Sequence, residues 1–135
     1  MQRDWCRFDS STFFQLVLLL AYALTNHQWG PLHAGRLSRP LSQAGSTKRS
    51  ENHEEFSQNM KDIVGRVEEL AKKKGLSMTQ LALAWITPKV SSPIVGFSSV
   101  ERMDDALGAR GVTLTEEENK YLEELYEPRK IEGHA

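Results

Sequence analysis

One short apolar segment, Pro93-Ile94-Val95-Gly96, restricts the fold of this chain more than any other feature. It has the composition of a buried β-strand, and the residues on either side of it have helical patterns. Helices that alternate with an apolar strand are typical of α/β folds, whose parallel strands are covered on both faces. Because one strand cannot form a sheet, its partner must lie upstream or in residues outside this chain.

Two helices are predicted before this strand. Apolar residues recur at three- and four-residue steps across residues 56–74, which gives one apolar stripe that ends at Gly75. A Ser-x-x-Gln capping box at residues 77–80 opens a second helix, which ends near Ile86 because Pro88 follows. The second helix could also begin a helix-turn-helix, but the β-like segment that follows does not fit that motif.

Two further helices are predicted after the strand. Ser99 is a suitable N-cap for a helix that runs to about Leu107. Thr115 and Glu118 form another capping box, so the last helix is expected over residues 116–126. This order predicts an α/β fold that is mostly helical, with one or two short parallel strands.

Length and composition limit the class of protein. The 135 residues suffice for one modest domain, and the net charge of −1 predicts no general attraction to nucleic acid or to an anionic membrane. Cys6 is the one cysteine, which excludes an internal disulfide and fits a reducing, cytoplasmic compartment. His27 and His33 have no carboxylate or cysteine at a ligand spacing, so no metal site is expected.

An apolar run at Phe13–Leu24 leaves two alternatives open. It is shorter than the about 20 residues that cross a bilayer, so no membrane span is expected. Arg3 and Arg7 precede it, and Ala21-Tyr22-Ala23 resembles a cleavage site, as in a secretory signal peptide; the protein would then be secreted. The alternative is a buried helix with its N-cap among residues 10–12.

Two stretches of the chain resemble one enzyme family. The sequence KKKGLSMTQLALAWITPKVSSPIVGFSSVERMDDAL, followed by LTEEENKYLEELYEP, resembles the C-terminal end of the aldo-keto reductases, especially fungal members of polyketide pathways. The sequence WGPLHAGRLSRP resembles the loop after the seventh barrel strand of that family. Residues 29–135 are therefore expected to form a partial, NADP-binding aldo-keto reductase domain, and residues 1–28 an unmatched apolar segment.

The resemblance implies a fold and an activity. Aldo-keto reductases are (β/α)8 TIM barrels that bind NADPH at their C-terminal face and reduce small-molecule aldehydes or ketones to alcohols. Such a barrel needs about 250 residues, so the chain is expected to be a C-terminal fragment whose barrel is not closed. The polar residues 25–28 stand where an apolar strand seven should precede Trp29, so this strand is expected to be damaged.

The resemblance also implies a site for NADP. In the family, the loop and helix after strand eight hold the adenosine phosphate, and the loop after strand seven lies along the pyrophosphate. The residues that take these roles by resemblance are Gly96, Ser98, Ser99 and Arg102 in the first loop, and Pro31, Leu32 and Gly35 in the second. A helix N-terminus offers unpaired N–H groups, and an arginine offers a planar set of donors to phosphate oxygens.

Each of these residues also has a structural explanation. Ser99 can cap its helix without a ligand, Gly96 can simply end a strand, and Arg102 can pair with Glu101 or Asp105 on its own helix. The chain also departs from the family pattern. Many members have a lysine or arginine in place of Ser98 and an asparagine in place of Ala106, and Gly30 replaces a serine of the strand-seven motif.

No catalytic residue is predicted. The family's catalytic tyrosine, lysine, aspartate and histidine lie on earlier strands, which no segment of this chain resembles. The tyrosines that match no catalytic motif are Tyr22, Tyr121 and Tyr126. Two hypotheses remain: a member or remnant of the NADPH-dependent aldo-keto reductases of fungal secondary metabolism, or a non-catalytic helical remnant that binds a partner. The isolated chain is expected to be inactive and marginally stable in both.

Overall fold

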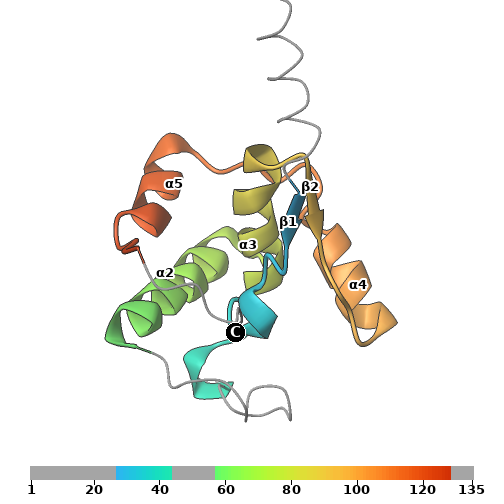
Figure 1. Cartoon of the computed structure of the whole chain (residues 1–135), viewed down its shortest axis with the longest axis horizontal. Coiled ribbons are helices and arrows are strands. Elements are labelled where there is room, and N and C mark those ends of the chain that lie inside the picture. The colour runs from blue at the N-terminus through green and yellow to red at the C-terminus, as the bar shows by residue number, and fades with distance from the viewer. Residues whose placement is uncertain (1–26, 44–56, 129–135) are drawn as a thin grey trace, which may run out of the picture.

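A computed structural model describes residues 27–43 and 57–128 (Figure 1). The elements are β1 (His27–Trp29), α2 (Gln58–Lys74), α3 (Met78–Ile86), β2 (Ser92–Ile94), α4 (Val100–Leu107) and α5 (Glu116–Glu123). Short 3₁₀ helices lie at His33–Gly35, Leu41–Gln43 and Thr87–Lys89. The mostly helical α/β order is confirmed. Cys6 and the apolar run Phe13–Leu24 lie outside the described residues.

The two strands form a parallel pair, with His27 opposite Ser92 and Trp29 opposite Ile94. The strand predicted around Ile94 therefore finds its partner upstream, and the described residues form a two-stranded sheet that is not closed. The expected damage to the preceding strand is only partial, because His27 and Gln28 pair in spite of their polar side chains. Strand pairing uses backbone groups, and both side chains are exposed.

Helices α2 and α3 contain most of the core. Ser57 caps α2 by accepting a hydrogen bond from the Met60 N–H at 3.3 Å, and Gly75 ends it in a left-handed conformation with φ 66°. Leu81 on α3 and Val64 on α2 are the largest fully buried side chains of the described residues. The core cluster between the two helices consists of Val64, Val67, Leu70, Ala71, Met78 and Leu81.

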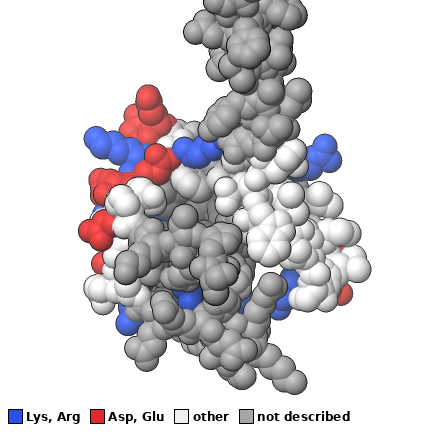
Figure 2. All heavy atoms as spheres, in the orientation of Figure 1, with Lys and Arg blue, Asp and Glu red and all other residues white. Residues whose placement is uncertain are grey.

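Helix α5 is joined to α2 by polar contacts and by Leu122, which packs against the core cluster. The Tyr121 hydroxyl donates to Glu69 at 2.8 Å, and the Arg66 guanidinium lies 4.5 Å from the centre of the Tyr121 ring. Lys74 and Glu118 form a salt bridge at 2.9 Å between the end of α2 and the start of α5. Figure 2 shows acidic side chains gathered over this side of the molecule.

The face around the strands and α4 is largely uncharged (Figure 2). Large apolar residues are exposed on it, among them Trp29, which is 79% exposed, and Val100, which is 65% exposed. The others are Ile94 on β2, Phe97 between β2 and α4, and Met103 and Leu107 on α4. Parallel strands are normally covered on both faces, so this face is one that further β/α units would cover in a closed barrel.

No helix within residues 27–43 and 57–128 has the combination of length and apolar character that crossing a membrane requires.

Candidate functional site

Both groups of predicted cofactor-binding residues lie at the same edge of the sheet. Because β1 and β2 are parallel, their carboxyl ends meet there; the loop with Pro31 and Gly35 follows β1, and the residues from Gly96 to Arg102 follow β2. The Gly30 N–H donates to the Ile94 carbonyl at 3.3 Å and joins the starts of the two loops. In α/β folds, ligands bind outside the carboxyl ends of the strands.

Arg102 and two serines form a group of exposed donors at the start of α4. The Ser99 hydroxyl accepts a hydrogen bond from the Arg102 N–H at 3.4 Å, which confirms Ser99 as the N-cap. The Arg102 Nη1 donates to the Ser98 Oγ at 2.8 Å. Among the described residues, Arg102 forms no salt bridge with the neighbouring acidic residues of its helix, so the alternative of an ion pair within α4 is not observed.

One anionic side chain lies within this group. Hydrogen bonds from its own backbone N–H and from the Ser99 hydroxyl lower the pKa of Glu101 below its usual range. The Glu101 carboxylate therefore stays ionised and uses donors at the helix N-terminus that an incoming phosphate would also use. A phosphate at this position would have to compete with Glu101 or displace it.

Gly96 lies between β2 and α4 beside open space. A Cβ added to it would meet no atom of the described residues within 4 Å. Gly96 is also absent from the residues with positive φ, so its backbone does not require a glycine. Within the described residues, neither packing nor the sign of φ explains the glycine, and the space beside it is open.

The loop after β1 contains three consecutive left-handed residues. His33, Ala34 and Gly35 have φ values of 48°, 55° and 92°. Only glycine adopts this region without steric cost, and strained backbone of this kind is concentrated at functional sites. In the same loop, Leu32 packs against a second core cluster that includes Leu83. The Leu32 side chain therefore packs on the core, and its carbonyl accepts hydrogen bonds from the N–H groups of Gly35 at 3.0 Å and Leu37 at 3.3 Å, so Leu32 holds the loop together.

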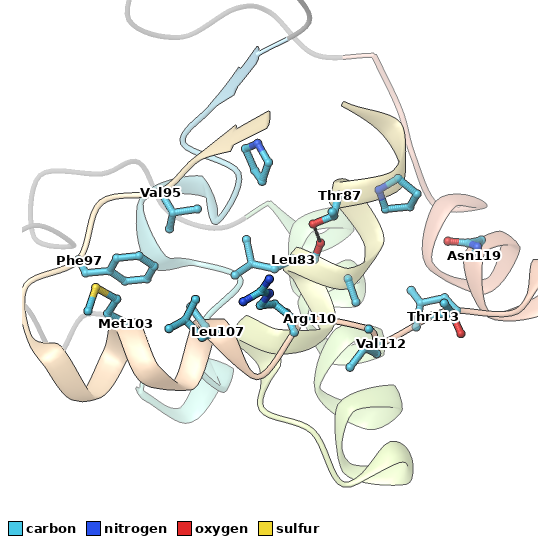
Figure 3. Close-up of a pocket in the computed structure, with 17 residues that line it drawn as sticks. Leu83, Thr87, Val95, Phe97, Met103, Leu107, Arg110, Val112, Thr113 and Asn119 are labelled. Atoms are coloured by element: carbon cyan, nitrogen blue, oxygen red, sulfur yellow. Dashed lines mark hydrogen bonds between the residues drawn. The ribbon is translucent and has the colours of Figure 1, made fainter. Parts of the chain in front are cut away.

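A pocket of about 660 Å³ lies beside this site, between α3, β2, α4 and the residues that follow α4. Figure 3 shows apolar side chains around it, including Leu83, Val95, Phe97, Met103 and Leu107. Arg110 is the one titratable side chain among the described residues that line it. The described lining of this pocket therefore offers mostly apolar contact. Sequence reasoning did not identify it.

The described tyrosines have no catalytic geometry. The hydrogen bond from the Tyr121 hydroxyl to Glu69 raises the pKa of Tyr121, which opposes proton donation. Tyr126 is exposed, and Tyr22 lies outside the described residues. Within residues 27–43 and 57–128, no three His, Cys, Asp or Glu side chains come close enough to hold a metal ion.

Sequence reasoning also missed the contacts that hold α4. Ser77 and Gln80 were predicted as a capping box, and the structure confirms this role for both. The same two side chains also reach Asp105 on α4, in contacts between residues far apart in the sequence. The sequence contains one signal for these contacts. A capping box uses the oxygens of Ser77 and Gln80 as acceptors and leaves the Ser77 hydroxyl hydrogen and the Gln80 Nε2 free to donate elsewhere.

Comparison with known proteins identifies the family to which these elements belong. Residues 20–127 match the aldo/keto reductase family, so the chain is a member of this family, as the resemblance indicated. The matched region begins upstream of Trp29, within the segment for which no resemblance was noted.

Several fungal proteins are similar to this chain. It is 46% identical over 113 residues to an aldo-keto reductase of Fusarium vanettenii, and 44% identical over 113 residues to one of Metarhizium robertsii; each match covers 79% of this chain and 30% of the relative. It is 40% identical over 111 residues to versiconal hemiacetal acetate reductase of Aspergillus parasiticus, covering 76% of this chain and 32% of that protein. The chain thus spans about a third of the length of these relatives.

Proposed function

We propose that this chain forms the part of an NADPH-dependent aldo-keto reductase that holds the adenosine 2′-phosphate of the cofactor. The observation that carries the proposal is the exposed donor pair of Arg102 and Ser98 at the N-terminus of α4. It lies at the carboxyl ends of parallel strands, where barrel enzymes place their ligands. The family membership supports it, because aldo-keto reductases generally use NADP(H).

The residues present fit a phosphate group. One guanidinium N–H of Arg102 is used by Ser98, and the remaining donors of the planar group can bind phosphate oxygens. Ser98 adds a hydroxyl group, a phosphate that displaced Glu101 would also meet the Ser99 hydroxyl, and the space beside Gly96 allows the cofactor to approach the backbone. Pro31 and Gly35 lie on the neighbouring loop at the same edge of the sheet and would face the pyrophosphate.

The activity of the whole enzyme would be reduction of a small aldehyde or ketone to an alcohol. The bound NADPH supplies the hydride for this reaction, and the residues of this chain bind and orient the cofactor. A role in fungal secondary metabolism agrees with the names of relatives such as versiconal hemiacetal acetate reductase. A cytoplasmic location agrees with the single cysteine, and it agrees with the use of NADPH, which is a cofactor found inside cells.

A second candidate is a non-catalytic helical remnant. The observation that favours it is the absence, among residues 27–43 and 57–128, of a tyrosine placed to donate a proton, since the Tyr121 hydroxyl is bound to Glu69. Under this candidate the chain carries out no reduction by itself, although it can retain the phosphate site.

The test is a titration of the ¹⁵N-labelled chain with adenosine 2′,5′-bisphosphate and, separately, with adenosine 5′-monophosphate. We expect NMR shifts of amides 96–103 that are larger and occur at lower concentration with the 2′-phosphate ligand. Equal responses, or none, would contradict the proposed site. Absorbance at 340 nm with NADPH and a panel of aldehydes tests the second candidate, because turnover above background would exclude the non-catalytic remnant.

A further inference from the structure

We propose that Asp105 is a positioning residue for the phosphate site: by binding the start of α3, it fixes the direction in which α4 presents Ser98 and Arg102. The inference rests on the proposed function, because it concerns the geometry of the same site. Asp105 itself faces α3 and takes no part in binding the phosphate.

Both carboxylate oxygens of Asp105 have a donor on α3. The Ser77 hydroxyl donates to Oδ2 at 2.9 Å, and the Gln80 Nε2 donates to Oδ1 at 3.1 Å. The same Gln80 nitrogen also donates to the Asp105 backbone carbonyl at 2.9 Å. Side chain and backbone of one residue of α4 are thus held by two residues of α3. We call these three hydrogen bonds the Asp105 clamp.

The two α3 residues of the clamp are themselves fixed. The Ser77 Oγ accepts from the Gln80 N–H at 3.1 Å, and the Gln80 Oε1 accepts from the Ser77 N–H at 3.1 Å. This capping box sets the rotamers of both side chains relative to the axis of α3. The orientation of α3, which is packed in the core, is therefore transmitted to α4 by short polar contacts.

Gly108 shows how closely the two helices approach at the clamp. A Cβ on this residue would lie 2.4 Å from the Gln80 Nε2 and 3.1 Å from the Asp105 carbonyl oxygen. The φ of Gly108 is −63°, so its conformation suits any residue. The glycine is needed for the close approach of Gln80, and a larger residue there would force the Gln80 side chain out of the clamp.

The rest of α4 is weakly held. Of its eight residues, Ala106 is the one that is buried. Met103 and Leu107 are 42% and 53% exposed and face the pocket in Figure 3. The clamp lies near the C-terminal end of α4 and the phosphate donors lie at the N-terminal end. The five residues from Asp105 back to Val100 span about 7.5 Å, so a tilt of about 10° at the clamp would move the first residue by about 1.3 Å.

The clamp has a second effect on Arg102. Asp105 lies three residues after Arg102 on the same helix, a spacing at which opposite charges form ion pairs. In the structure the Asp105 carboxylate is bound by α3, and Arg102 binds Ser98. Holding Asp105 against α3 therefore leaves the guanidinium of Arg102 directed toward the site instead of toward its own helix.

The test compares Asp105→Ala and Gly108→Ala with Asp104→Ala, which removes the same charge from an exposed neighbour on α4. The quantity measured is the ratio of the dissociation constants for adenosine 5′-monophosphate and adenosine 2′,5′-bisphosphate. We expect Asp105→Ala and Gly108→Ala to lower this preference about fivefold or more, and Asp104→Ala to change it by less than twofold. Asp105→Asn, which keeps one acceptor oxygen for Gln80, should give an intermediate value.

Two results would overturn the inference. One is an equal preference in Asp105→Ala and Asp104→Ala. The other is an equal weakening of both ligands in Asp105→Ala, which a general loss of stability would cause. A measurement without ligand separates this inference from the proposed function: residual dipolar couplings report the direction of α4 relative to α3. If the wild-type chain binds neither ligand, the proposed function fails. The direction of α4 in Asp105→Ala then still tests the clamp: an unchanged direction overturns it, and a changed direction supports it.

Discussion

The Arg102 Nη1 lies 2.8 Å from the Ser98 Oγ, so the side chains of a helix and of the loop that precedes it form one donor pair. The guanidinium has five N–H groups, and this bond uses one of them. The pair also restrains the long Arg102 side chain at an exposed position, which lowers the conformational entropy that binding has to remove.

The first prediction concerns this pair. Arg102→Ala should weaken binding of adenosine 2′,5′-bisphosphate about tenfold, because a hydrogen bond to a charged group contributes about 1.5–3 kcal/mol and exposure reduces it. Binding of adenosine 5′-monophosphate should change little, and isothermal titration at two salt concentrations measures both. Arg110→Ala is the matched control, since it removes the same charge after the end of α4. An equal loss in both variants would mean that only the net charge matters.

The second prediction concerns Gly96. Gly96→Ala should raise the melting temperature slightly, because the added methyl group meets no described atom, the φ is not left-handed, and alanine restricts the unfolded chain more than glycine does. The same variant should weaken binding of NADPH severalfold, because the proposed site brings the cofactor close to the backbone of residue 96. A scanning fluorimetry melt and a binding titration on the same sample measure both effects. A loss of stability without a loss of affinity would show that the glycine serves the fold.

Helix starts were predictable from the sequence because they depend on local chemistry. Ser77, Ser99 and Thr115, the caps predicted from the sequence, all cap helices in the structure. A side-chain oxygen and the amide three residues later satisfy each other in any context, so a stretch of four residues suffices. The strand at Ile94 was likewise indicated by its own composition.

Contacts between distant segments were not predictable in the same way. The helix that Asp105 faces could not be inferred from local pattern, because it depends on how α3 and α4 cross. The strand at residues 27–29 was underestimated for the same reason, since its stability comes from pairing with β2 and not from its side chains. The pocket beside α4 likewise arises from elements that only the tertiary arrangement brings together.

The third prediction concerns Glu101. Its carboxylate is ionised at neutral pH and lies at the helix N-terminus, where it repels a phosphate and uses the Ser99 hydroxyl. Glu101→Gln should therefore strengthen binding of adenosine 2′,5′-bisphosphate about two- to fivefold, because the amide removes the repulsion between two negative charges, which solvent weakens at an exposed site. Asp104→Asn is the control on the same helix. Weaker binding in Glu101→Gln would indicate that this carboxylate positions the donors instead of competing for them.

The fourth prediction is a pH dependence of the last helix. The Thr115 N–H and the Lys74 ammonium lower the pKa of Glu118, and Lys89 and Trp85 lower that of Glu123. Both carboxylates therefore stabilise the folded state fully above the ordinary glutamate pKa of about 4.3, and the stabilisation is lost as the pH falls through their lowered values.

Urea unfolding at pH 6 and at pH 3 measures this effect. The urea concentration at the unfolding midpoint of the wild-type chain should be lower at pH 3 than at pH 6. Glu118→Gln should reduce this difference, because the amide cannot change its charge. Glu127→Gln, which alters an exposed residue after α5, is the control. A pH dependence identical in the two variants would show that Glu118 does not anchor α5 to α2.

The fifth prediction tests where the stability of the chain resides. Leu81 is fully buried between α2 and α3, whereas Leu107 on α4 is 53% exposed. Leu81→Ala should lower the free energy of unfolding by about 2–5 kcal/mol, the range for a core leucine, and Leu107→Ala by about 1 kcal/mol or less. Since the apolar face around the strands is uncovered, total stability should be small enough that Leu81→Ala unfolds much of the chain at 25 °C. Circular dichroism with urea titration measures both variants. Similar losses in the two would mean that α4 is packed as firmly as α3, and a wild-type chain that melts cooperatively at high temperature would show that the two-stranded sheet needs no further units to be stable.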